Sequence, residues 1–506
     1  MGSRVLTGSV FMAAREKSRV IVLWGKIIYS AYMKILVIGQ GGREHALIWK
    51  LVQSKKVQKI YAAPGNGGTM AEEKTENLKW AEPLSGEGQK KLVEFALEEK
   101  IDLTVVGPEA PLAEGIADRF REAGLKIVGP GRDAARLESS KVYSESFMKK
   151  FGVCSPKRNA FTKLSDALEF AHIYFNNNSG KADDKKSRDA DSSSASSSLQ
   201  QAANVKVSAP LVIKADGLAA GKGVVIAADE DEAKKALNDF MKTGAIGDAG
   251  KSVVFEEYLD GFEVSVMAAV SVSAGKGVIK PFIPAMDHKR RFEGGIGPNT
   301  GGMGAIAPVP EFTPSLQKEF TGSILEPTLK GMKDEQIDYR GFIFFGLMVV
   351  KDSCYLLEYN ARLGDPETQA LLPLMDSDLA ELCLAMEDGT LADFTIEWKI
   401  GAVCAPVLAV EGYPGPGRKD DPIAINQTGL DKTGAKVFVA GAVRGAAGSP
   451  VSELRTTGGR TLAVSAYGNN AGEAYENAYK AIGHISFEGM VYRTDIGLKR
   501  EEKSHG

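Results

Sequence analysis

The sequence has few cysteines and no long apolar run. Its four cysteines, Cys154, Cys354, Cys383 and Cys404, are scattered and never form a CxxC pair. We therefore predict four reduced, mostly buried thiols rather than a disulfide framework or a zinc site. The longest apolar run, "FIFFGLMVV" at 342–350, is far shorter than the ~18 residues that a membrane-spanning helix needs. The sequence thus predicts no membrane partner.

An excess of basic residues is also missing. The formal net charge is −3 and the isoelectric point is about 6.1. These values give no electrostatic reason to expect nucleic acid or anionic lipid as a partner. The composition, 43% hydrophobic and 25% charged, is typical of a soluble globular protein. With 506 residues, the chain has room for about three domains.

Residues 1–32 differ in charge from the rest of the chain. They carry five basic residues and a single acid, Glu16. Two interpretations stay open: an organellar transit peptide, or an extension with no targeting role. Nothing in the sequence suggests secretion, so apart from this leader we expect a cytoplasmic protein.

From Met33 onward, strand-like and helical segments alternate. Buried strands are expected at 34–38, 59–64, 103–108 and 126–130. Such alternation indicates a parallel sheet with crossover helices. We expect this first domain to end near Leu137.

Beyond residue 137 the sequence pattern changes. A helix is expected at 140–150, and the polar, Ser-rich segment 176–204 is expected to be a disordered insertion. The stretches 211–228, 252–270 and 341–360 each place two strand-like segments around a turn. They indicate antiparallel sheets. A strand-rich unit with one helix, at 471–482, completes the chain.

One strand ends in two ligand-type side chains. In "YLLEYNARLGDPETQ" (355–369), strict alternation places Leu356, Glu358 and Asn360 on one face. A carboxylate and an amide oxygen at a strand end suit Mg²⁺, which takes few protein ligands and completes its shell with phosphate and water. Arg362, just beyond, could hold an anion with two hydrogen bonds. The alternative is a turn capped by polar residues.

Three glycine-rich or acidic stretches carry further candidates. In "VIKADGLAAGKGVVI" (212–226), glycines and Lys214 could approach phosphate, with Lys141 as a second lysine; the alternative is a flexible hairpin. "FEEYLDGFE" (255–263) could read adenine and ribose, or be an acidic surface hairpin. "DHKRRFEGGIGPNTGGMGA" (287–305) could form an anion-binding nest, or be a mobile loop.

The first glycine turn does not fit a dinucleotide site. "GQGGREH" (39–45) has Glu44 where the third glycine of GxGxxG belongs, and no acid follows at the expected spacing. We instead expect this turn to bind a phosphorylated small molecule at the N-terminus of the helix.

Nine segments together resemble one family. They are "GQGGREHAL", "APGNGG", "VVGPEAPL", "VIKADGLAAGKGV", "EEYLDGFE", "DHKR", "GPNTGGMGA", "EYNARLGDPETQ" and "RTTGGRTLAVSAYG". In this order and spacing, from Met33 to about Gly497, they closely resemble the phosphoribosylamine–glycine ligases, also called glycinamide ribonucleotide synthetases. These are ATP-grasp enzymes of purine biosynthesis.

The resemblance implies an α/β and α+β multidomain fold. The expected parts are a leader or extension (1–32), an N-terminal parallel-sheet, pre-ATP-grasp domain (33–137), an ATP-grasp catalytic domain (138–154 and 229–395), an ATP-grasp lid (155–228) with the disordered insertion (176–204), and a strand-rich C-terminal domain (396–497).

The resemblance also implies the reaction. ATP activates the carboxylate of glycine as glycyl phosphate, and the amine of 5-phosphoribosylamine attacks it, which gives glycinamide ribonucleotide, ADP and phosphate in IMP biosynthesis. No side-chain nucleophile is needed, which agrees with the lack of a Ser-His-Asp or Cys-His signature. A lid must exclude water from glycyl phosphate, and we expect 217–223 to do so. The partners are these small molecules, in a monomer or small homo-oligomer.

Site residues follow from the same resemblance. The Mg²⁺ or Mn²⁺ ligands are Glu358 and Asn360. The ATP-binding residues are Lys141, Lys214, Gly221, Lys222, Gly223, the adenine-side hinge Glu256, Glu257, Tyr258 and Leu259, and Glu263 at the ribose. Lys214, Asp287, Lys289 and Arg362 are the catalytic residues. The other substrate is bound by Gly39, Gly41, Gly42, Arg43, Glu44, Gly65 and Asn66, and the glycine site is completed by Pro298, Thr300, Gly301, Gly302 and Met303.

Two departures and two alternatives complete these expectations. The insertion falls inside the lid, where we expect it to point outward and to be dispensable. The basic leader is also outside the pattern of the family. In addition, the segment 342–350 offers no acid for a second metal ion, so the ligands of that ion stay open. The alternatives are another ATP-grasp carboxylate–amine ligase or carboxylase with a different acceptor, and a nucleotide-binding regulator that does not turn over.

Overall fold

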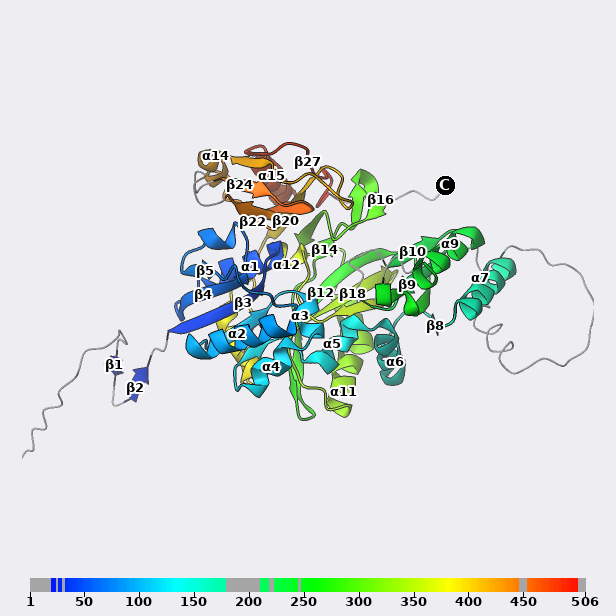
Figure 1. The fold of residues 1–506 in the computed structure, drawn as a ribbon, viewed down its shortest axis with the longest axis horizontal. Coiled ribbons are helices and arrows are strands. Elements are labelled where there is room, and N and C mark those ends of the chain that lie inside the picture. Colours follow the sequence, from blue (N-terminus) through cyan, green and yellow to red (C-terminus); the bar gives the residue numbers. More distant parts are fainter. Residues whose placement is uncertain are drawn as a thin grey trace, which may run out of the picture.

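The computed structural model describes residues 20–23, 26–29, 32–178, 210–217, 223–243, 247–445 and 453–498. Most of the expected leader and of the Ser-rich insertion lies outside these ranges, as do Gly221 and Lys222. Within the leader, β1 (Val20–Leu23) and β2 (Lys26–Tyr29) pair as a two-stranded antiparallel sheet. The remaining described strands form five larger sheets and a small hairpin (Figure 1).

The N-terminal sheet is parallel throughout, as predicted. Its five strands have the order β5-β4-β3-β6-β7. The strands are β3 (Met33–Gly39), β4 (Val57–Pro64), β5 (Thr75–Asn77), β6 (Leu103–Val106) and β7 (Ile127–Val128). The helices are α1 (Gly42–Leu51), η1 (Thr69–Ala71), α2 (Gly86–Glu98), α3 (Glu109–Ala113), α4 (Ile116–Glu122) and α5 (Arg132–Ser139). Because both faces are covered, β3 and β6 are almost wholly buried.

A small antiparallel sheet carries the lysine and glycine motif. After α6 (Lys141–Phe151), its order is β10-β9-β11-β8. Its members are β8 (Arg158–Phe161), β9 (Leu211–Ala215), β10 (Val224–Ala227) and β11 (Val253–Glu257), with helices α7 (Leu164–Asn178), α9 (Glu230–Met241) and η2 (Gly247–Lys251). Phe161, Phe170 and Phe255 pack between the sheet and these helices. The other face is therefore left for polar side chains.

The helix α7 corrects one boundary. It continues to Asn178, three residues into the segment expected to be disordered from 176. The side-chain amide of Asn176 contacts the His172 ring one turn earlier, at 3.0 Å, which supports the last turn of the helix. The rest of that prediction lies outside the described residues.

The central sheet has the antiparallel order β13-β12-β18-β19. Its strands are β12 (Phe262–Ser273), β13 (Lys276–Pro281), β18 (Tyr339–Val350) and β19 (Ser353–Asn360). The accompanying helices are α10 (Pro314–Phe320), η4 (Thr321–Leu325), α11 (Glu326–Asp334), α12 (Glu367–Leu371), α13 (Leu379–Glu387) and η5 (Leu391–Asp393). The strands β11 and β12, expected as one antiparallel pair, belong to different sheets, so the acidic turn between them crosses from the lid to the core.

The C-terminal region is strand-rich and takes strands from the glycine-rich motif. One sheet has the order β14-β17-β20-β25-β22 with β27 beside β20, another has the order β23-β24-β21-β26, and β15 pairs with β16. The strands are β14 (Met286–Asp287), β15 (Arg290–Phe292), β16 (Ile296–Asn299), β17 (Gly304–Ala307), β20 (Ala402–Val410), β21 (Pro422–Ile425), β22 (Lys436–Val439), β23 (Ala442–Arg444), β24 (Leu454–Thr456), β25 (Arg460–Gly468), β26 (Ile485–Ser486) and β27 (Met490–Val491). The helices are η3 (Glu293–Gly295), α14 (Gln427–Asp431) and α15 (Ala471–Ile482).

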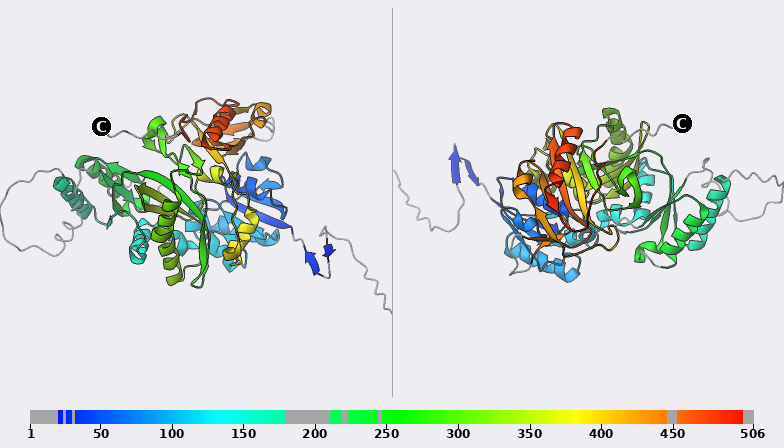
Figure 2. Two further views of the ribbon diagram at one scale, coloured as in Figure 1. Left: turned by 180° about the vertical axis from the view of Figure 1, so that it is seen from behind. Right: turned by 90° about the horizontal axis from the view of Figure 1, so that it is seen from above.

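This arrangement brings distant segments together. Both views of Figure 2 show the C-terminal elements beside the N-terminal sheet, with the lid helices α7 and α9 projecting from the other end. The side chain of Phe438 on β22 contacts the rings of His45 and Trp49 on α1, with centroids 5.6 and 5.5 Å apart. The four cysteines are free, as predicted. The predicted fold class, a parallel N-terminal sheet, antiparallel sheets with a small lid and a strand-rich C-terminal part, is confirmed.

Candidate functional site

The strand β19, which carries the predicted metal ligands, contains a β-bulge. Glu358 lies opposite Gly346, whereas the preceding pair joins Leu356 to Leu347. Leu357 is therefore the extra residue of a bulge. The prediction that Leu356 shares a face with Glu358 is wrong, because the bulge interrupts the alternation and Leu356 packs in the same core as Tyr359. The bulge leaves Glu358 and Asn360 on the opposite side from that core.

Lysines surround Glu358. Burial acts to raise the pKa of this carboxyl, but the charges of Lys289, Lys214, Lys141 and Arg362 outweigh it and hold the pKa below its usual value. Glu358 is therefore a carboxylate at neutral pH. Among the described residues, none donates a hydrogen bond to it. Its oxygens are available as ligands.

Lys214 and Lys141 come from opposite sides of the boundary between lid and core. Lys214 on β9 forms an ion pair with Glu256, at 2.6 Å, and donates to the carbonyl of Leu357 at 3.3 Å. Lys141, at the start of α6, donates to the carbonyl of Gly217 at 2.8 Å. Burial lowers the pKa of Lys141. Lys214 from the lid and Lys141 from α6 thus both lie at the bulged end of β19, where they form one positively charged site.

The predicted hinge residues do not all face the same way. Glu256 is 3% exposed and pairs with Arg158 (3.0 Å) as well as with Lys214. Glu257 accepts a long hydrogen bond from the amide of Lys157, at 3.5 Å. Tyr258 and Leu259 are partly exposed between β11 and β12. Gly223 is buried, and its carbonyl accepts from the amide of Ala215 at 2.8 Å.

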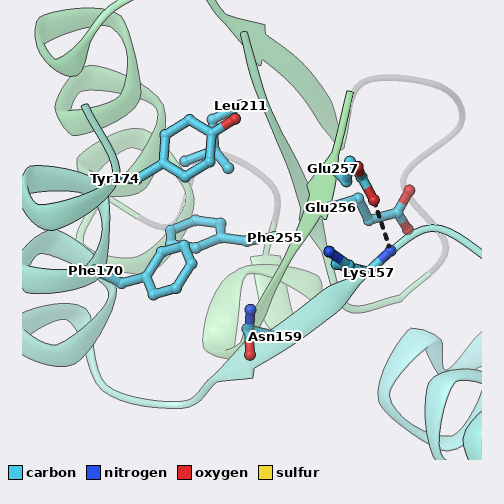
Figure 3. A pocket seen from close by; sticks show the side chains of 8 residues that line it. All are labelled: Lys157, Asn159, Phe170, Tyr174, Leu211, Phe255, Glu256 and Glu257. Atoms are coloured by element: carbon cyan, nitrogen blue, oxygen red, sulfur yellow. Dashed lines mark hydrogen bonds between the residues drawn. The ribbon is translucent and has the colours of Figure 1, made fainter. Parts of the chain in front are cut away.

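A small cavity lies behind this hinge (Figure 3). It is lined by Lys157, Asn159, Phe170, Tyr174, Leu211, Phe255, Glu256 and Glu257. In Figure 3 the aromatic side chains and Leu211 lie on one side of β11, and Glu256, Glu257 and Lys157 lie on the other. Its apolar part belongs to the packed core between sheet and helices. The cavity therefore backs onto the hinge and does not contain the lysines around Glu358.

The motif 287–305 supplies an acid and a lysine to the site. Lys289 pairs with Glu263 at 2.5 Å; burial would lower the lysine pKa, but Glu263 and Glu358 raise it overall. Asp287 is half-buried, and its buried Oδ1 has no hydrogen-bond partner among the described residues. Burial, with Glu367 nearby, raises the pKa of Asp287 well above its usual value. Glu263, expected at the ribose, thus faces Lys289.

The loop after Lys289 is fixed by its own backbone. Thr300 Oγ1 donates to the Lys289 carbonyl at 2.8 Å and accepts from the amide of Gly302 at 3.0 Å. Gly302 has φ +112°, and an added Cβ would lie 2.6 Å from Asp287 Oδ1. Glycine is therefore required there. Pro298 lies in β16 and Met303 is fully buried.

Arg362 lies between two carboxylates. Its Nε is 3.2 Å from Glu109 Oε2, its Nη2 is 3.1 Å from Glu138 Oε1, and the same Nη2 donates to Asn360 Oδ1 at 3.2 Å. Burial would lower the pKa of Arg362, but Glu138, Glu109 and other acids raise it overall. The guanidinium therefore stays charged.

The first glycine turn is occupied by its own glutamate. Glu44 Oε2 accepts from the amide of Gly41 at 2.5 Å, and Glu44 Oε1 pairs with Arg43 Nε at 2.7 Å. Arg43 Nη1 donates to the carbonyl of Leu363 at 3.0 Å. Gly39 has φ +126°, and an added Cβ would lie 2.5 Å from Glu44 Cγ. The side chain of Glu44 thus takes one of the amides expected to meet a phosphate, while the turn itself lies next to Arg362.

Asn66 links this turn to the C-terminal region. Its side-chain amide donates to the carbonyls of Gln40 (2.9 Å) and Val439 (2.7 Å). Gly65, just before it, has φ +73° and Gly42 is buried. The predicted substrate-side residues from 39 to 66 are therefore brought together, although Arg43, Glu44 and Asn66 bind protein groups in this structure.

Sequence reasoning missed several residues of the site. Glu138 and Glu109 hold Arg362; Arg158 donates to the carbonyls of Leu356 (3.0 Å) and Leu357 (2.6 Å). Arg460, from β25, pairs with Asp365 at 3.2 Å and donates to the carbonyl of Gly301 at 2.5 Å. Arg460 could have been found, because it lies in the motif "RTTGGRTLAV". Glu138 carries no comparable signal.

The donor set suits a hard divalent cation that also binds phosphate. Within the described ranges, no group of three or more His, Cys, Asp and Glu side chains could hold a metal ion by itself. Glu358 and Asn360 offer two oxygens, few enough that phosphate and water would fill the remaining positions.

Within the same ranges, no helix is both long and apolar enough to cross a membrane.

Comparisons with known proteins cover almost the whole of this architecture. The models of the N, ATP-grasp (A) and C domains of phosphoribosylglycinamide synthetase match residues 33–138, 185–368 and 402–499. The phosphoribosylamine–glycine ligase of Clostridium acetobutylicum is 46% identical over 468 residues, which cover 92% of this chain and 100% of that protein. Its namesake from Neisseria meningitidis serogroup B is 42% identical over 470 residues, which cover 92% of this chain and 99% of that protein.

Solved structures agree with the sequence comparison. The crystal structure of phosphoribosylamine–glycine ligase from Thermotoga maritima matches with a TM-score of 0.70 and 30% identity, over 92% of this chain and 100% of that one. The biotin carboxylase domain of Hydrogenobacter thermophilus 2-oxoglutarate carboxylase matches with a TM-score of 0.61 over 91% and 92%. At 15% identity, this second likeness shows the fold alone. The chain belongs to the phosphoribosylglycinamide synthetase family.

Proposed function

We propose that this protein is a phosphoribosylamine–glycine ligase of purine biosynthesis. It joins glycine to 5-phosphoribosylamine and converts ATP to ADP and phosphate, with glycyl phosphate as the intermediate. The observation that carries the proposal is the gathering of Lys141, Lys214 and Lys289 around the half-buried carboxylate of Glu358. The relatives of that name, similar along their whole length, support the same reaction.

We assign phosphate binding to the lysines. A triphosphate at Lys141 and Lys214 would replace the present partners of these lysines, the carbonyl of Gly217 and the Glu256 carboxylate. The lysine charges then oppose the charge that develops on the transferring phosphoryl group. Glu358 and Asn360 would hold Mg²⁺ or Mn²⁺, which, when bound, neutralises phosphate charge and orients the phosphoryl group.

We assign glycine binding to the region around Asp287. The unpartnered Oδ1 of Asp287 and the guanidinium of Arg362 offer an acceptor for an ammonium group and a donor for a carboxylate. Lys289 and the 298–303 loop complete this side of the site. The turn at 39–45 and Gly65–Asn66 form the side on which phosphoribosylamine would enter.

The domain assignments are part of the proposal. Residues 33–137 would face phosphoribosylamine, 138–154 with 258–395 would carry out catalysis, 155–228 would act as the lid, and 396–497 would form the C-terminal domain. We add 229–257, expected as catalytic, to that lid, because α9 and β11 pack with β8 and β9 in the small sheet. The strands β14 and β17 pair with the C-terminal sheet, so the catalytic and C-terminal parts share structure across the proposed boundary.

The test is product formation by the purified full-length chain. With ATP, Mg²⁺, glycine and 5-phosphoribosylamine, mass spectrometry should detect glycinamide ribonucleotide and ADP in equal amounts. ADP release that requires another carboxylate or amine would indicate a different ATP-grasp ligase. Nucleotide binding with no turnover under any of these conditions would indicate a regulator.

A further inference from the structure

Glu138 is a buried carboxylate that the proposed reaction does not use. It lies near the end of α5, and its side chain is 7% exposed. Both of its oxygens are engaged: Oε2 accepts from the amide of Ala361 at 2.7 Å, and Oε1 pairs with Arg362 Nη2 at 3.1 Å. Such a fully satisfied buried charge fixes the groups that it binds.

Both partners of Glu138 directly follow the strand end that carries the ligand oxygens. Ala361 is the residue after Asn360, and Arg362 Nη2 also donates to Asn360 Oδ1 at 3.2 Å. One guanidinium nitrogen therefore joins Glu138 to the side-chain oxygen of Asn360. The orientation of that oxygen depends on a residue more than two hundred positions earlier in the chain.

Glu109 cannot replace Glu138 in this role. It binds Arg362 through Nε, at 3.2 Å, and not through the nitrogen that reaches Asn360. Its side chain is also more exposed, 34% against 7% for Glu138. Without Glu138, the amide of Ala361 would lose its acceptor and Arg362 could follow Glu109 toward solvent, away from Asn360.

We propose that Glu138 is a positioning residue of the ligation reaction. It holds Asn360 and Arg362 in the geometry that a divalent ion with bound ATP requires, and it contacts neither the ion nor ATP itself. The inference rests on the proposed function, because it takes Asn360 as a ligand. The same role explains why Glu138 lies three residues before Lys141, the residue of this segment that would bind ATP phosphate.

The test compares Glu138→Ala and Glu138→Gln with a matched control, Glu387→Gln. The side chain of Glu387 is likewise buried, with 3% exposed, and likewise lies near arginines, Arg121 and Arg340, but it sits at the end of α13 and contacts none of the proposed site residues in an ion pair. Glutamine at 138 keeps an oxygen for the amide of Ala361 and loses the charge that holds Arg362. The control measures the cost of losing a buried glutamate charge as such.

The readout is Mn²⁺ binding to each protein with a non-hydrolysable ATP analogue, followed by the electron paramagnetic resonance signal of free Mn²⁺. We expect affinity to fall about 10-fold in Glu138→Ala and about 3-fold in Glu138→Gln, and to be unchanged in Glu387→Gln. Circular dichroism verifies folding. If Glu138→Ala does not fold, Glu138→Gln carries the test.

The outcomes separate this inference from the proposed function. Wild-type Mn²⁺ affinity in a folded Glu138 variant would overturn the positioning role and leave the proposed ligase intact. An equal loss in Glu387→Gln would also overturn it, because the effect would then come from general destabilisation. A wild-type protein that binds the analogue but no Mn²⁺ would overturn the metal assignment and this inference with it, whether or not product forms.

Discussion

Two clusters of glutamate and arginine, each built around a glutamate with a buried side chain, invite comparison. The site cluster, Glu109, Glu138 and Arg362, places one arginine between two acids at 3.2 and 3.1 Å. The interface cluster, Arg121, Arg340 and Glu387, places one acid near two arginines, both at 3.6 Å. In the interface cluster, Glu387 Oε1 and Arg121 Nε lack hydrogen-bond partners among the described residues. Glu138, in contrast, has a partner for each oxygen.

Perturbed ionisation does not distinguish the clusters. Burial raises the pKa of Glu138 to about 7 despite Arg362, and burial raises that of Glu387 despite Arg121 and Arg340. Both would therefore be flagged as functional by their pKa values alone. The difference lies in what each cluster holds. The site cluster fixes the end of a strand with available ligand oxygens, whereas the interface cluster joins α4 and β18 to α13. The following experiments test that distinction.

The largest effect is expected at Glu358, the proposed metal ligand on the strand end that the site cluster holds in place. Glu358→Gln should lower turnover by about 100- to 1,000-fold, because an amide removes the charge that balances the surrounding lysines and holds the ion. Product formation is measured by mass spectrometry and folding by thermal melting. Activity close to that of the wild type would contradict the metal assignment.

The same substitution in each cluster should separate their roles. Arg362→Lys loses the planar fork that meets two carboxylates and Asn360, and misplacement at the site should lower kcat/KM by about 100-fold. Arg121→Lys is the matched control and should lower the melting temperature while kcat/KM is unchanged. Equal losses of kcat/KM in both variants would erase the distinction.

Removing the interface acid should affect stability alone. Glu387→Leu leaves Arg121 without its acid, and we expect a loss of about 2 kcal/mol. The loss is limited because Arg340 keeps a two-pronged contact with Asp338, at 2.9 and 2.6 Å. Differential scanning calorimetry measures it as a lower melting temperature. A loss of activity in the folded protein would show that this cluster also serves the site.

A third buried contact should give the smallest effect, through pH. His45 contacts Glu72 at 3.0 Å, and burial lowers the pKa of the imidazole despite that acid. The unfolded chain therefore binds a proton more readily than the folded one, so stability falls as pH drops below about 6.5. His45→Gln, which cannot take up a proton, should reduce the fall in melting temperature between pH 7.5 and 5.5 by about 1–2 °C. An unaltered pH profile would contradict the assignment.

Much of the fold follows from local patterns. The buried strand β3, the glycine turn after it and α15 at 471–482 were all predictable from periodicity and turn residues. The strand pair β18 and β19 follows in the same way, since a short polar turn separates two apolar runs. The family resemblance of the motifs also put Lys214, Lys289 and Glu358 among the expected site residues, and the structure brings these three charges together.

The sequence by itself thus determined many of the elements, the order of the motifs and the residue types able to bind phosphate, although the strands β15, β16 and β17 lie in a segment that was expected to be a loop. Only the tertiary structure decided the bulge at Leu357, the separation of β11 and β12 into two sheets, and the pairing of Glu138 with Arg362. The physical reason is that each of these depends on contacts between segments far apart in the chain. Local periodicity records which side chains are buried, but not which distant charge will be buried beside them.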